Sequence, residues 1–395
     1  MPEPKITIII PTRERCDVLE SSLRTVTSQD YDNLDIIVCD NFSNDDTHGV
    51  VHRANDKRIR YLNTGKRLSM SHNWEHALSH VNEGWVTFIG DDDGLLPRSV
   101  ATIAEIISKT CVSAIRSSFC TYDWPSIVGN TSGQLIVPSS TGIEMRSSNQ
   151  WLSKVMRGQE KYNQLPMIYN GGFINISILN AIREKTGAYF RSASPDVYSA
   201  IAISRMIDFY AYVRDPLAIS GTSKHSNGHS FFSVSEQRSN QPRTKFASEG
   251  NIPFHADVPL CADGSYPLSL QVCAYEAYLQ SDMLGNDVKF VSPAQQLQVI
   301  MATAGKHQSS LSEWGKIFSE KHRIDFHKTS RCRSFKSRYL RLAAMTRKVL
   351  NAVNSTIVET LPITNIHEAS IAAAVIRSAP SRMDTIRYLA SRLAK

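Results

Sequence analysis

Short apolar runs alternate with amphipathic segments through the N-terminal part of the chain, and this alternation constrains the fold more than any other feature. Residues 5–10 form an isoleucine-rich run, typical of a central parallel strand that is buried on both faces. Helices are expected between the strands, including residues 17–28, with Asp17 as a cap, and residues 70–81. The expected strands are residues 5–10, 34–39, 59–62 and 85–89. Such alternation predicts an α/β fold with a doubly wound, mostly parallel sheet.

Polar loops follow three of these strands. Arg13 and Arg15 come after the first strand, and residues 40–46, rich in acids and turn formers, come after the second. The fourth strand ends at three consecutive carboxylates, residues 91–93. In open parallel sheets, ligands bind beyond the carboxyl ends of the strands. The sequence therefore predicts that these three loops meet at one edge of the sheet and form the site.

The three carboxylates are Asp91, Asp92 and Asp93. Adjacent acids repel one another, so a positive partner is expected, and ligands that offer only oxygen suit a hard cation such as Mg²⁺ or Mn²⁺. A solvated acidic loop is the alternative. Gly94 allows the backbone to turn, and Pro97 is expected to occupy the first position of the next helix.

The motifs in the sequence argue against three classes of protein: dinucleotide-binding oxidoreductases, P-loop NTPases and zinc peptidases. No Gly-x-Gly-x-x-Gly follows the first strand, and residues 64–67 resemble a P-loop only superficially, because Arg60 stands where glycine is required. His72, Glu75 and His76 fit the His-x-x-Glu-His pattern of a zinc peptidase helix. No further helix offers a third ligand, so we interpret them as ordinary helix residues.

Taken in order, several of these segments resemble the family 2 glycosyltransferases. The resemblance covers about residues 4–220, and its motifs are residues 7–13, Asp40, the helix that carries Asn73, and the aspartates before Pro97. It implies a GT-A fold with a helical C-terminal region, and inverting transfer from a nucleotide sugar. The residues that it implies for binding the nucleotide sugar are Pro11, Thr12, Arg13, Arg15, Asp40, Asn41, Lys66, Arg67, Asn73, Asp91 and Asp92.

The resemblance also assigns roles within this set. Asp40 would hydrogen-bond the base, usually uracil, while Lys66, Arg67 and Asn73 would reach the diphosphate or the ribose. Gly90 stands where the family usually has its first aspartate. The metal ligands would therefore come from Asp91, Asp92 and Asp93, with the choice of two left open.

The catalytic residue is expected at the start of a later helix. Ser194 suits an N-cap, Pro195 the first helical position, and Asp196 the first turn, where acids are favoured in any case. The family places its catalytic aspartate at such a helix start, about 100 residues beyond the metal motif, and Asp196 lies 103 positions after Asp93. The resemblance therefore implies that Asp196 is the catalytic base, with Asp208 as the alternative.

Further elements are predicted along the chain. A polar loop at 217–230 carries Lys224, His225 and His229, which could contact the diphosphate or the metal. The remaining expected helices are residues 100–107, 149–156, 176–185 and 268–284, and the remaining strands are 112–115, 119–122 and 208–213. A helix at 176–185 should end at Gly187.

The net charge of +7 resides in the second half of the chain. Residues 1–220 contain 22 Lys and Arg against 24 Asp and Glu, whereas residues 221–395 contain 22 against 13. Within residues 331–350, seven basic side chains accompany no acid, which predicts a basic amphipathic helix at an anionic membrane surface. A solvated helical face is the alternative. Nucleic acid is not expected as a partner, because no recognition motif accompanies the charge.

Three features of the sequence bear on the cellular compartment: the length of its apolar runs, its N-terminus and its cysteines. The longest apolar runs fall short of the ~18 to 20 residues of a membrane-spanning helix, and the N-terminus does not resemble a signal peptide. The seven scattered cysteines contain no Cys-x-x-Cys pair, so reduced thiols are expected rather than disulfides or a zinc site. We expect a cytoplasmic protein, with peripheral contact at the inner face of the plasma membrane as an option.

These observations combine into one hypothesis. Residues 1–235 would form the GT-A domain, and residues 236–395 a mainly helical, basic region. The expected function is metal-dependent, inverting transfer from a nucleotide sugar, usually a UDP-sugar, to a glycan or lipid-linked acceptor in surface polysaccharide synthesis. A sugar nucleotidyltransferase and a non-catalytic nucleotide-sugar-binding subunit remain as alternatives.

Overall fold

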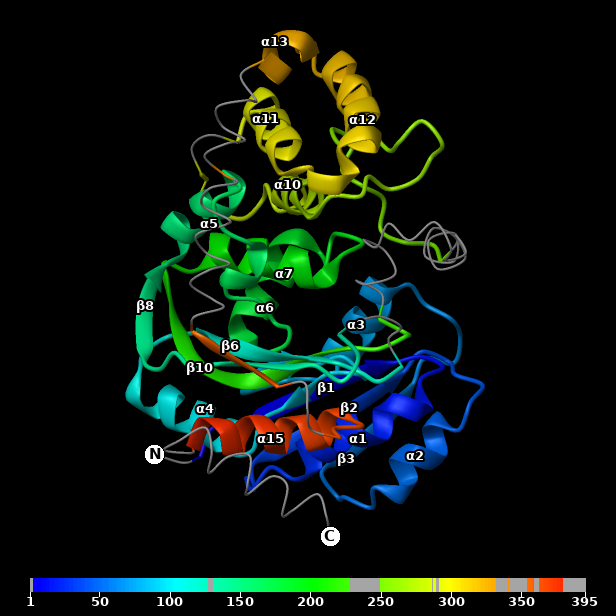
Figure 1. Ribbon diagram of the computed structural model, residues 1–395, viewed down its shortest axis with the longest axis vertical. Coiled ribbons are helices and arrows are strands. Elements are labelled where there is room, and N and C mark those ends of the chain that lie inside the picture. The colour runs from blue at the N-terminus through cyan, green and yellow to red at the C-terminus, as the bar shows by residue number, and fades with distance from the viewer. Residues whose placement is uncertain are drawn as a thin grey trace.

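A central β-sheet organises the computed structural model (Figure 1). The structure describes residues 3–126, 131–226, 249–285, 287–288, 291–331, 340, 354–358 and 362–378. In this part of the chain the sheet has eleven strands, and its main path runs β11-β7-β6-β9-β4-β1-β2-β3. The strands β5, β8 and β10 pair beside this path.

The parallel part of the sheet carries the N-terminal loops. Its strands are β1 (Ile6–Thr12), β2 (Leu34–Asp40), β3 (Ile59–Asn63) and β4 (Trp85–Phe88). β1 pairs in parallel with both β2 and β4, and Thr12 lies opposite Asp40 at the end of the β1–β2 pair. This register brings the predicted polar loops to one edge, and the predicted strands and fold class are confirmed.

Helices cover both faces of the sheet (Figure 1). The lower layer contains α1 (Cys16–Thr27), α2 (Thr47–Arg53) and α4 (Ser99–Lys109). The upper layer contains α3 (Met70–Leu78), α5 (Ser148–Met156), α6 (Ile176–Thr186) and α7 (Pro195–Met206). Each layer packs on the sheet through its own apolar cluster: Trp74 and Leu78 of α3 belong to the upper one, and Leu19 and Leu23 of α1 to the lower one.

Two predicted helix starts are wrong. Asp17 does not cap α1: the helix begins at Cys16, whose backbone N–H is capped from a distant loop by the Asp45 carboxylate at 2.9 Å. Pro97 does not open α4, which begins at Ser99 after Arg98 with a left-handed φ of 64°. The reason is that Leu95 and Leu96 are tied to β10, so the chain is still extended at this point.

The second half of the sheet differs from prediction in two places. The expected strands at 112–115 and 119–122 form a single strand, β6 (Ala114–Asp123). β10 (Phe209–Thr222) continues through residues 217–222, which were expected in a loop, because they pair with β6 and with β5 (Gly94–Leu95). The remaining strands are β7 (Leu135–Pro138), β8 (Ile143–Ser147), β9 (Gly172–Asn175) and β11 (Ser355–Val358).

A group of helices stands above the upper layer (Figure 1). It comprises α10 (Leu270–Gln280), α11 (Pro293–Thr303), α12 (Gln308–Lys321) and α13 (Phe326–Arg331), and α10 packs directly on α7. Short 3₁₀ turns occur at Tyr162–Gln164 (η1) and Gly305–His307 (η2). The predicted domain boundary at residue 235 lies outside the described residues.

The C-terminal part of the chain returns to the sheet. β11 pairs with β7 in antiparallel orientation, and α15 (Ile366–Ser378) packs against α1 on the lower face. Most of the basic stretch 331–350 lies outside the described residues, so its predicted membrane contact stays a prediction. In the described ranges, every helix is too short or too polar to cross a bilayer.

Candidate functional site

The three consecutive aspartates occupy the turn after β4 and are all buried. Asp91 Oδ1 accepts a hydrogen bond from Arg15 Nη1 at 2.9 Å. Asp93 accepts from the backbone N–H groups of Gly221 and Gly90, at 2.8 and 3.0 Å, on its two oxygens. Asp91 and Asp93 are therefore held by bonds from within the chain.

Asp92 faces the segment that follows β10. Its Oδ2 accepts hydrogen bonds from the hydroxyls of Ser223, at 2.7 Å, and Ser226, at 2.5 Å. Its Oδ1 has no hydrogen bond within the described residues. Lys224 and His225 pair with Asp17, at 3.1 and 3.0 Å, and the predicted contact of His229 lies outside the described residues.

Burial sets the electrostatics of the acidic turn. Burial works against the charge of Arg15, but the carboxylates of Asp91 and Asp92 more than offset it and raise the pKa of the guanidinium. Burial also raises the pKa of Asp91, and Arg15 offsets only part of this effect. For Asp93, burial and the charge of Asp92 raise the pKa to about 7.

Tyr169 joins this turn to the predicted catalytic helix, a role that sequence reasoning missed. Its hydroxyl donates to Asp93 Oδ2 at 2.5 Å. Burial raises the pKa of Tyr169 well above its usual value, and the charges of Asp93, Asp92 and, more weakly, Asp196 raise it further. The segment that carries Tyr169 also contacts α7 directly, because the backbone N–H of Ile168 donates to the Ser199 hydroxyl at 3.4 Å. The signal in the sequence was the pair of glycines after Asn170, which form a tight turn in which Gly171 has a φ of 90°.

Asp196 lies in the first turn of α7, as predicted, and is half-buried. Tyr162 of η1, also missed from the sequence, donates to Asp196 Oδ2 at 2.7 Å. Burial raises the pKa of Asp196, and the Tyr162 hydrogen bond lowers it in part. Asp208 is exposed beyond the other end of α7, roughly 18 Å along the helix, so the structure does not bring it to this site.

The loop after β2, which is predicted to bind the nucleobase, is held by hydrogen bonds within the protein. Asp40 is 2% exposed and accepts from the Tyr61 hydroxyl at 2.5 Å, the Asn63 amide at 3.1 Å and the Ser43 backbone N–H at 2.9 Å. The Asn41 side chain bonds both backbone groups of Leu68, each at 2.8 Å. Asn41 therefore fixes the chain before α3.

The other predicted nucleotide contacts spread over a wider surface. Arg13 pairs with Glu249 at 2.5 Å, and Arg67 pairs with Glu14. Lys66 and Arg67 are exposed, whereas Asn73 is buried and accepts from the Cys39 thiol at 3.2 Å. Pro11 and Thr12 lie at the end of β1, opposite Cys39 and Asp40.

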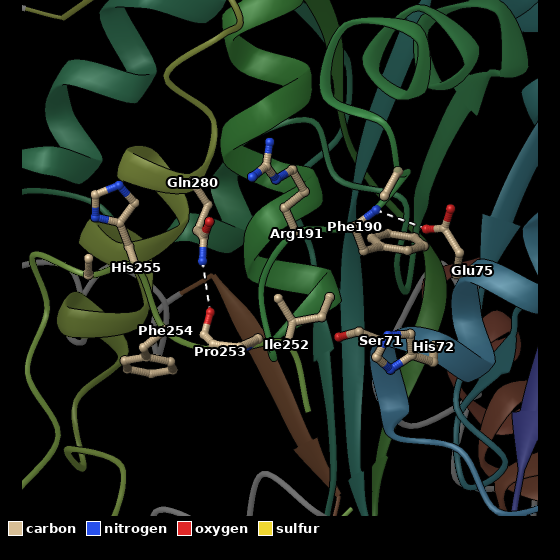
Figure 2. A pocket seen from close by; sticks show the side chains of 12 residues that line it. Ser71, His72, Glu75, Phe190, Arg191, Ile252, Pro253, Phe254, His255 and Gln280 are labelled. Atoms are coloured by element: carbon tan, nitrogen blue, oxygen red, sulfur yellow. Dashed lines mark hydrogen bonds between the residues drawn. The ribbon is translucent and has the colours of Figure 1, made fainter. Parts of the chain in front are cut away.

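A pocket of about 540 Å³ opens beside the turn that leads to Asp196 (Figure 2). Glu75 of the His-x-x-Glu-His segment faces this pocket, where its carboxylate accepts from the backbone N–H groups of Tyr189 and Phe190. His72 Nδ1 lies 2.7 Å from the Ser69 hydroxyl. These contacts are structural, and they leave the peptidase pattern without support. The lining includes Ser71, His72, Glu75, Phe190, Arg191, Phe254, His255 and Gln280.

The acidic turn fits a divalent ion that arrives with a ligand. No group of three or more His, Cys, Asp or Glu side chains in the described ranges is arranged to hold a metal ion. Both oxygens of Asp93 accept hydrogen bonds, whereas Asp91 accepts from Arg15 through Oδ1 and Asp92 accepts from two serines through Oδ2. Asp91 Oδ2 and Asp92 Oδ1 are therefore the candidate atoms to bind a metal ion. Mg²⁺ is usually bound by one or two carboxylates together with substrate phosphates, so a single aspartate suffices. The predicted metal role of the trio stays a prediction.

The fold and the acidic edge define an α/β protein of the GT-A class, and comparison with known proteins gives its family. The profile described as glycosyl transferase family 2 matches residues 7–167. This part of the chain matches that family, and the family resemblance predicted from the sequence is confirmed.

Individual relatives match over shorter lengths. A Campylobacter jejuni protein named GalNAc(5)-diNAcBac-PP-undecaprenol beta-1,3-glucosyltransferase is 36% identical over 26% of this chain and 34% of its own. An Escherichia coli protein, UDP-Glc:alpha-D-GlcNAc-diphosphoundecaprenol beta-1,3-glucosyltransferase WfgD, is 24% identical over 31% and 49%. The chain thus spans a third to a half of these relatives. Staphylococcus aureus TarS 1–349 with UDP-GlcNAc aligns over 82% of this chain and 89% of its own, at 14% identity and a TM-score of 0.46.

Proposed function

We propose that the protein is a metal-dependent, inverting glycosyltransferase that moves a sugar from a UDP-sugar to a lipid-linked saccharide in surface polysaccharide synthesis. The observation that carries this proposal is the meeting of two acidic segments at Tyr169. The Tyr169 hydroxyl donates to Asp93. The backbone N–H of Ile168 beside it donates to the Ser199 hydroxyl, which in turn donates to the Asp196 carbonyl, 103 positions beyond Asp93. An activated donor and a base can act together only if their sites adjoin.

Asp196 is the proposed base. It would take the proton from an acceptor hydroxyl while that oxygen attacks the anomeric carbon on the face opposite the departing nucleotide, which inverts the centre. Arg13 and Arg15 would face the nucleotide sugar at the end of β1, and Asp40 would hydrogen-bond the nucleobase of the donor. When bound, Mg²⁺ or Mn²⁺ would neutralise the charge that develops on the diphosphate, and Asp92 is the residue that would hold it.

The relatives suggest the first substrates to test. WfgD is named for transfer from UDP-Glc to alpha-D-GlcNAc-diphosphoundecaprenol. We therefore propose UDP-glucose as donor and GlcNAc-diphosphoundecaprenol as acceptor for the initial assay. An acceptor anchored in a membrane also suits the excess of basic residues in the second half of the chain, which would attract anionic headgroups.

Titration calorimetry with UDP tests the proposed metal role. We expect Mn²⁺ to strengthen UDP binding to the wild-type protein by about tenfold or more, roughly 1.4 kcal/mol. Asp92→Ala should remove this dependence, while Asp30→Ala, at an exposed aspartate before β2, should keep it. Equal UDP affinity with and without Mn²⁺ in the wild-type protein would count against the metal site.

Turnover separates the alternatives. Release of UDP and formation of a lengthened lipid-linked product supports the proposal. Release of pyrophosphate from a nucleoside triphosphate and a sugar phosphate would indicate a nucleotidyltransferase instead. Binding of donor without transfer to any lipid-linked acceptor, and without slow hydrolysis, would indicate a non-catalytic subunit.

A further inference from the structure

Glu276 of α10 is a carboxylate with no exposed surface, and the proposed chemistry does not use it. It accepts hydrogen bonds from three side-chain or backbone donors. Ser192 Oγ donates to Oε2 at 2.6 Å, while the His255 backbone N–H, at 3.1 Å, and Gln280 Nε2, at 2.8 Å, both donate to Oε1. Burial raises the pKa of Glu276, and these bonds offset part of the rise.

Stability alone does not account for such a residue. Taking a carboxylate out of water costs several kcal/mol, and well-packed apolar replacements of buried charges are often neutral or stabilising. A buried polar group is better explained when it fixes one arrangement among several. The segments that Glu276 joins therefore indicate what it does.

The first of these segments is the turn that leads to the proposed base. Ser192 lies four residues before Asp196 and is 1% exposed. Its carbonyl accepts from the Ser71 hydroxyl of α3 at 2.6 Å, and its own hydroxyl accepts from the Ser194 backbone N–H at 3.4 Å. The turn is thus held between α3 on one side and α10 on the other, with Glu276 as the anchor on α10.

The second segment that Glu276 joins is residues 253–255, which form one wall of the pocket. Gln280 Nε2 donates to the Pro253 carbonyl at 3.0 Å (Figure 2). The same nitrogen also donates to Glu276 Oε1. The His255 backbone is bonded to the same carboxylate, and both Pro253 and His255 line the pocket. One buried network therefore sets the pocket wall relative to the turn of Asp196.

We propose that Glu276 is a positioning residue that holds the Asp196 turn in register with the pocket wall formed by Pro253 and His255. The helical region beyond the family match thereby supplies part of the geometry at which an acceptor meets the base. This inference rests on the proposed function, because it takes Asp196 as the base. Glu276 acts through Ser192 and does not itself touch substrate.

Ser192→Ala is the sharpest test, since it removes the 2.6 Å link between Glu276 and the turn and, besides it, only the long 3.4 Å contact from the Ser194 backbone N–H. With UDP-glucose and GlcNAc-diphosphoundecaprenol, we expect kcat to fall roughly 10- to 100-fold, because small misplacements of a catalytic group carry such losses. KM for UDP-glucose should stay within about twofold, since donor contacts are untouched. Ser204→Ala is the matched control: it removes a different buried hydroxyl, one within α7 that donates to the Ala200 carbonyl, and should leave kcat unchanged.

Substitutions of Glu276 test whether the pair acts as a unit. Glu276→Gln should keep kcat within about threefold, because an amide can accept from His255 and Gln280 and donate to the Ser192 hydroxyl. Glu276→Ala should lose as much as Ser192→Ala, and the double variant should lose no more than the worse single one. Additive losses, or a loss in Glu276→Gln as large as in Glu276→Ala, would overturn the inference.

Hydrogen exchange separates this inference from the proposed function. In the free protein, amides of residues 190–198 should exchange about tenfold faster in Ser192→Ala than in the wild type, with unchanged exchange in β1 and β4. If the wild-type protein transfers no sugar, the proposed function fails while this readout still decides the positioning role. Wild-type exchange in residues 190–198 of Ser192→Ala, or wild-type kcat with normal thermal stability, overturns the positioning role.

Discussion

The acidic turn after β4 and the start of α7 hold their carboxylates in opposite ways. Asp91, Asp92 and Asp93 are buried and accept hydrogen bonds from segments far away in sequence. Asp196 is half-buried and, within the described residues, accepts one side-chain hydrogen bond, from Tyr162. The first arrangement fixes the positions of the carboxyl groups before any ligand arrives. The second leaves a carboxylate that can still exchange a proton with a ligand, as a base must.

The largest expected effect follows from removing that base. Asp196→Asn should lower kcat for sugar transfer by about 10²- to 10⁴-fold, the usual contribution of general base catalysis, because an amide cannot take the acceptor proton. Donor affinity, measured by calorimetry, should stay within about twofold. The contrast between the two acidic regions breaks down if Asp196→Asn binds UDP-glucose much more weakly, because Asp196 would then belong to the donor site.

Asp208→Asn is the matched control for this change. It makes the same substitution at the exposed aspartate beyond the other end of α7. We expect wild-type kcat for this variant. A loss comparable to that of Asp196→Asn would restore Asp208 as a candidate and contradict its placement away from the acidic turn.

The second prediction concerns stability of the acidic turn without metal. Burial and the charge of Asp92 raise the pKa of Asp93 from 3.8 to about 7. The pKa of Asp93 is higher in the folded protein than in the unfolded chain. The stabilisation that the protonated Asp93 side chain gives the folded state is therefore fully present below pH 3.8, and it is lost as the pH rises through about 7. Between pH 5 and 8, the free energy of unfolding of the wild type should fall by about 2–3 kcal/mol relative to Asp93→Asn.

Urea unfolding with EDTA, followed by tryptophan fluorescence at several pH values, measures this difference. Comparison with Asp93→Asn cancels the titration of histidines, which both proteins share. Parallel curves for the two proteins would show that Asp93 titrates at its ordinary pKa. Addition of Mn²⁺ should reduce the loss at high pH, since a cation favours the ionised carboxylates.

How far the sequence could predict this site depends on where the bonding partners lie. The strands, their polar ends and the position of Asp196 in the first turn of a helix follow from local patterns, and the structure has them. Tyr169 and Tyr162 could not be found in this way, because they reach Asp93 and Asp196 from 76 and 34 positions away. Contacts at such separations are set by packing rather than by periodicity.

The errors in the fold have the same origin. β6 was expected as two strands because Arg116, Ser117 and Ser118 interrupt its apolar pattern. Arg116 is nonetheless buried, and its guanidinium donates to the carbonyls of Asn163, Tyr169 and Asn170 at 2.7–2.9 Å. A buried arginine that bonds three distant carbonyls looks, in a sequence, like a loop residue. The return of β11 and α15 to the sheet is likewise a long-range event.

The smallest expected effect tests whether Asp196 is tuned by its single side-chain partner. The Tyr162 hydrogen bond lowers the pKa of Asp196, while burial raises it. Tyr162→Phe should therefore raise this pKa further, and the acid limb of the kcat–pH profile should move to higher pH. The sign follows from the role: a base acts when deprotonated, so a higher pKa reduces the rate at low pH and has little effect at high pH.

Tyr210→Phe controls for loss of a buried hydroxyl nearby, because the Tyr210 hydroxyl donates to the Gln164 carbonyl of the same 3₁₀ turn rather than to a carboxylate. Its profile should match the wild type. If Tyr162→Phe instead lowers kcat equally at every pH, the hydroxyl orients Asp196 rather than setting its proton affinity. Asp196 would then be a fixed carboxylate like those of the acidic turn, and the contrast between the two regions would not explain which of them exchanges protons.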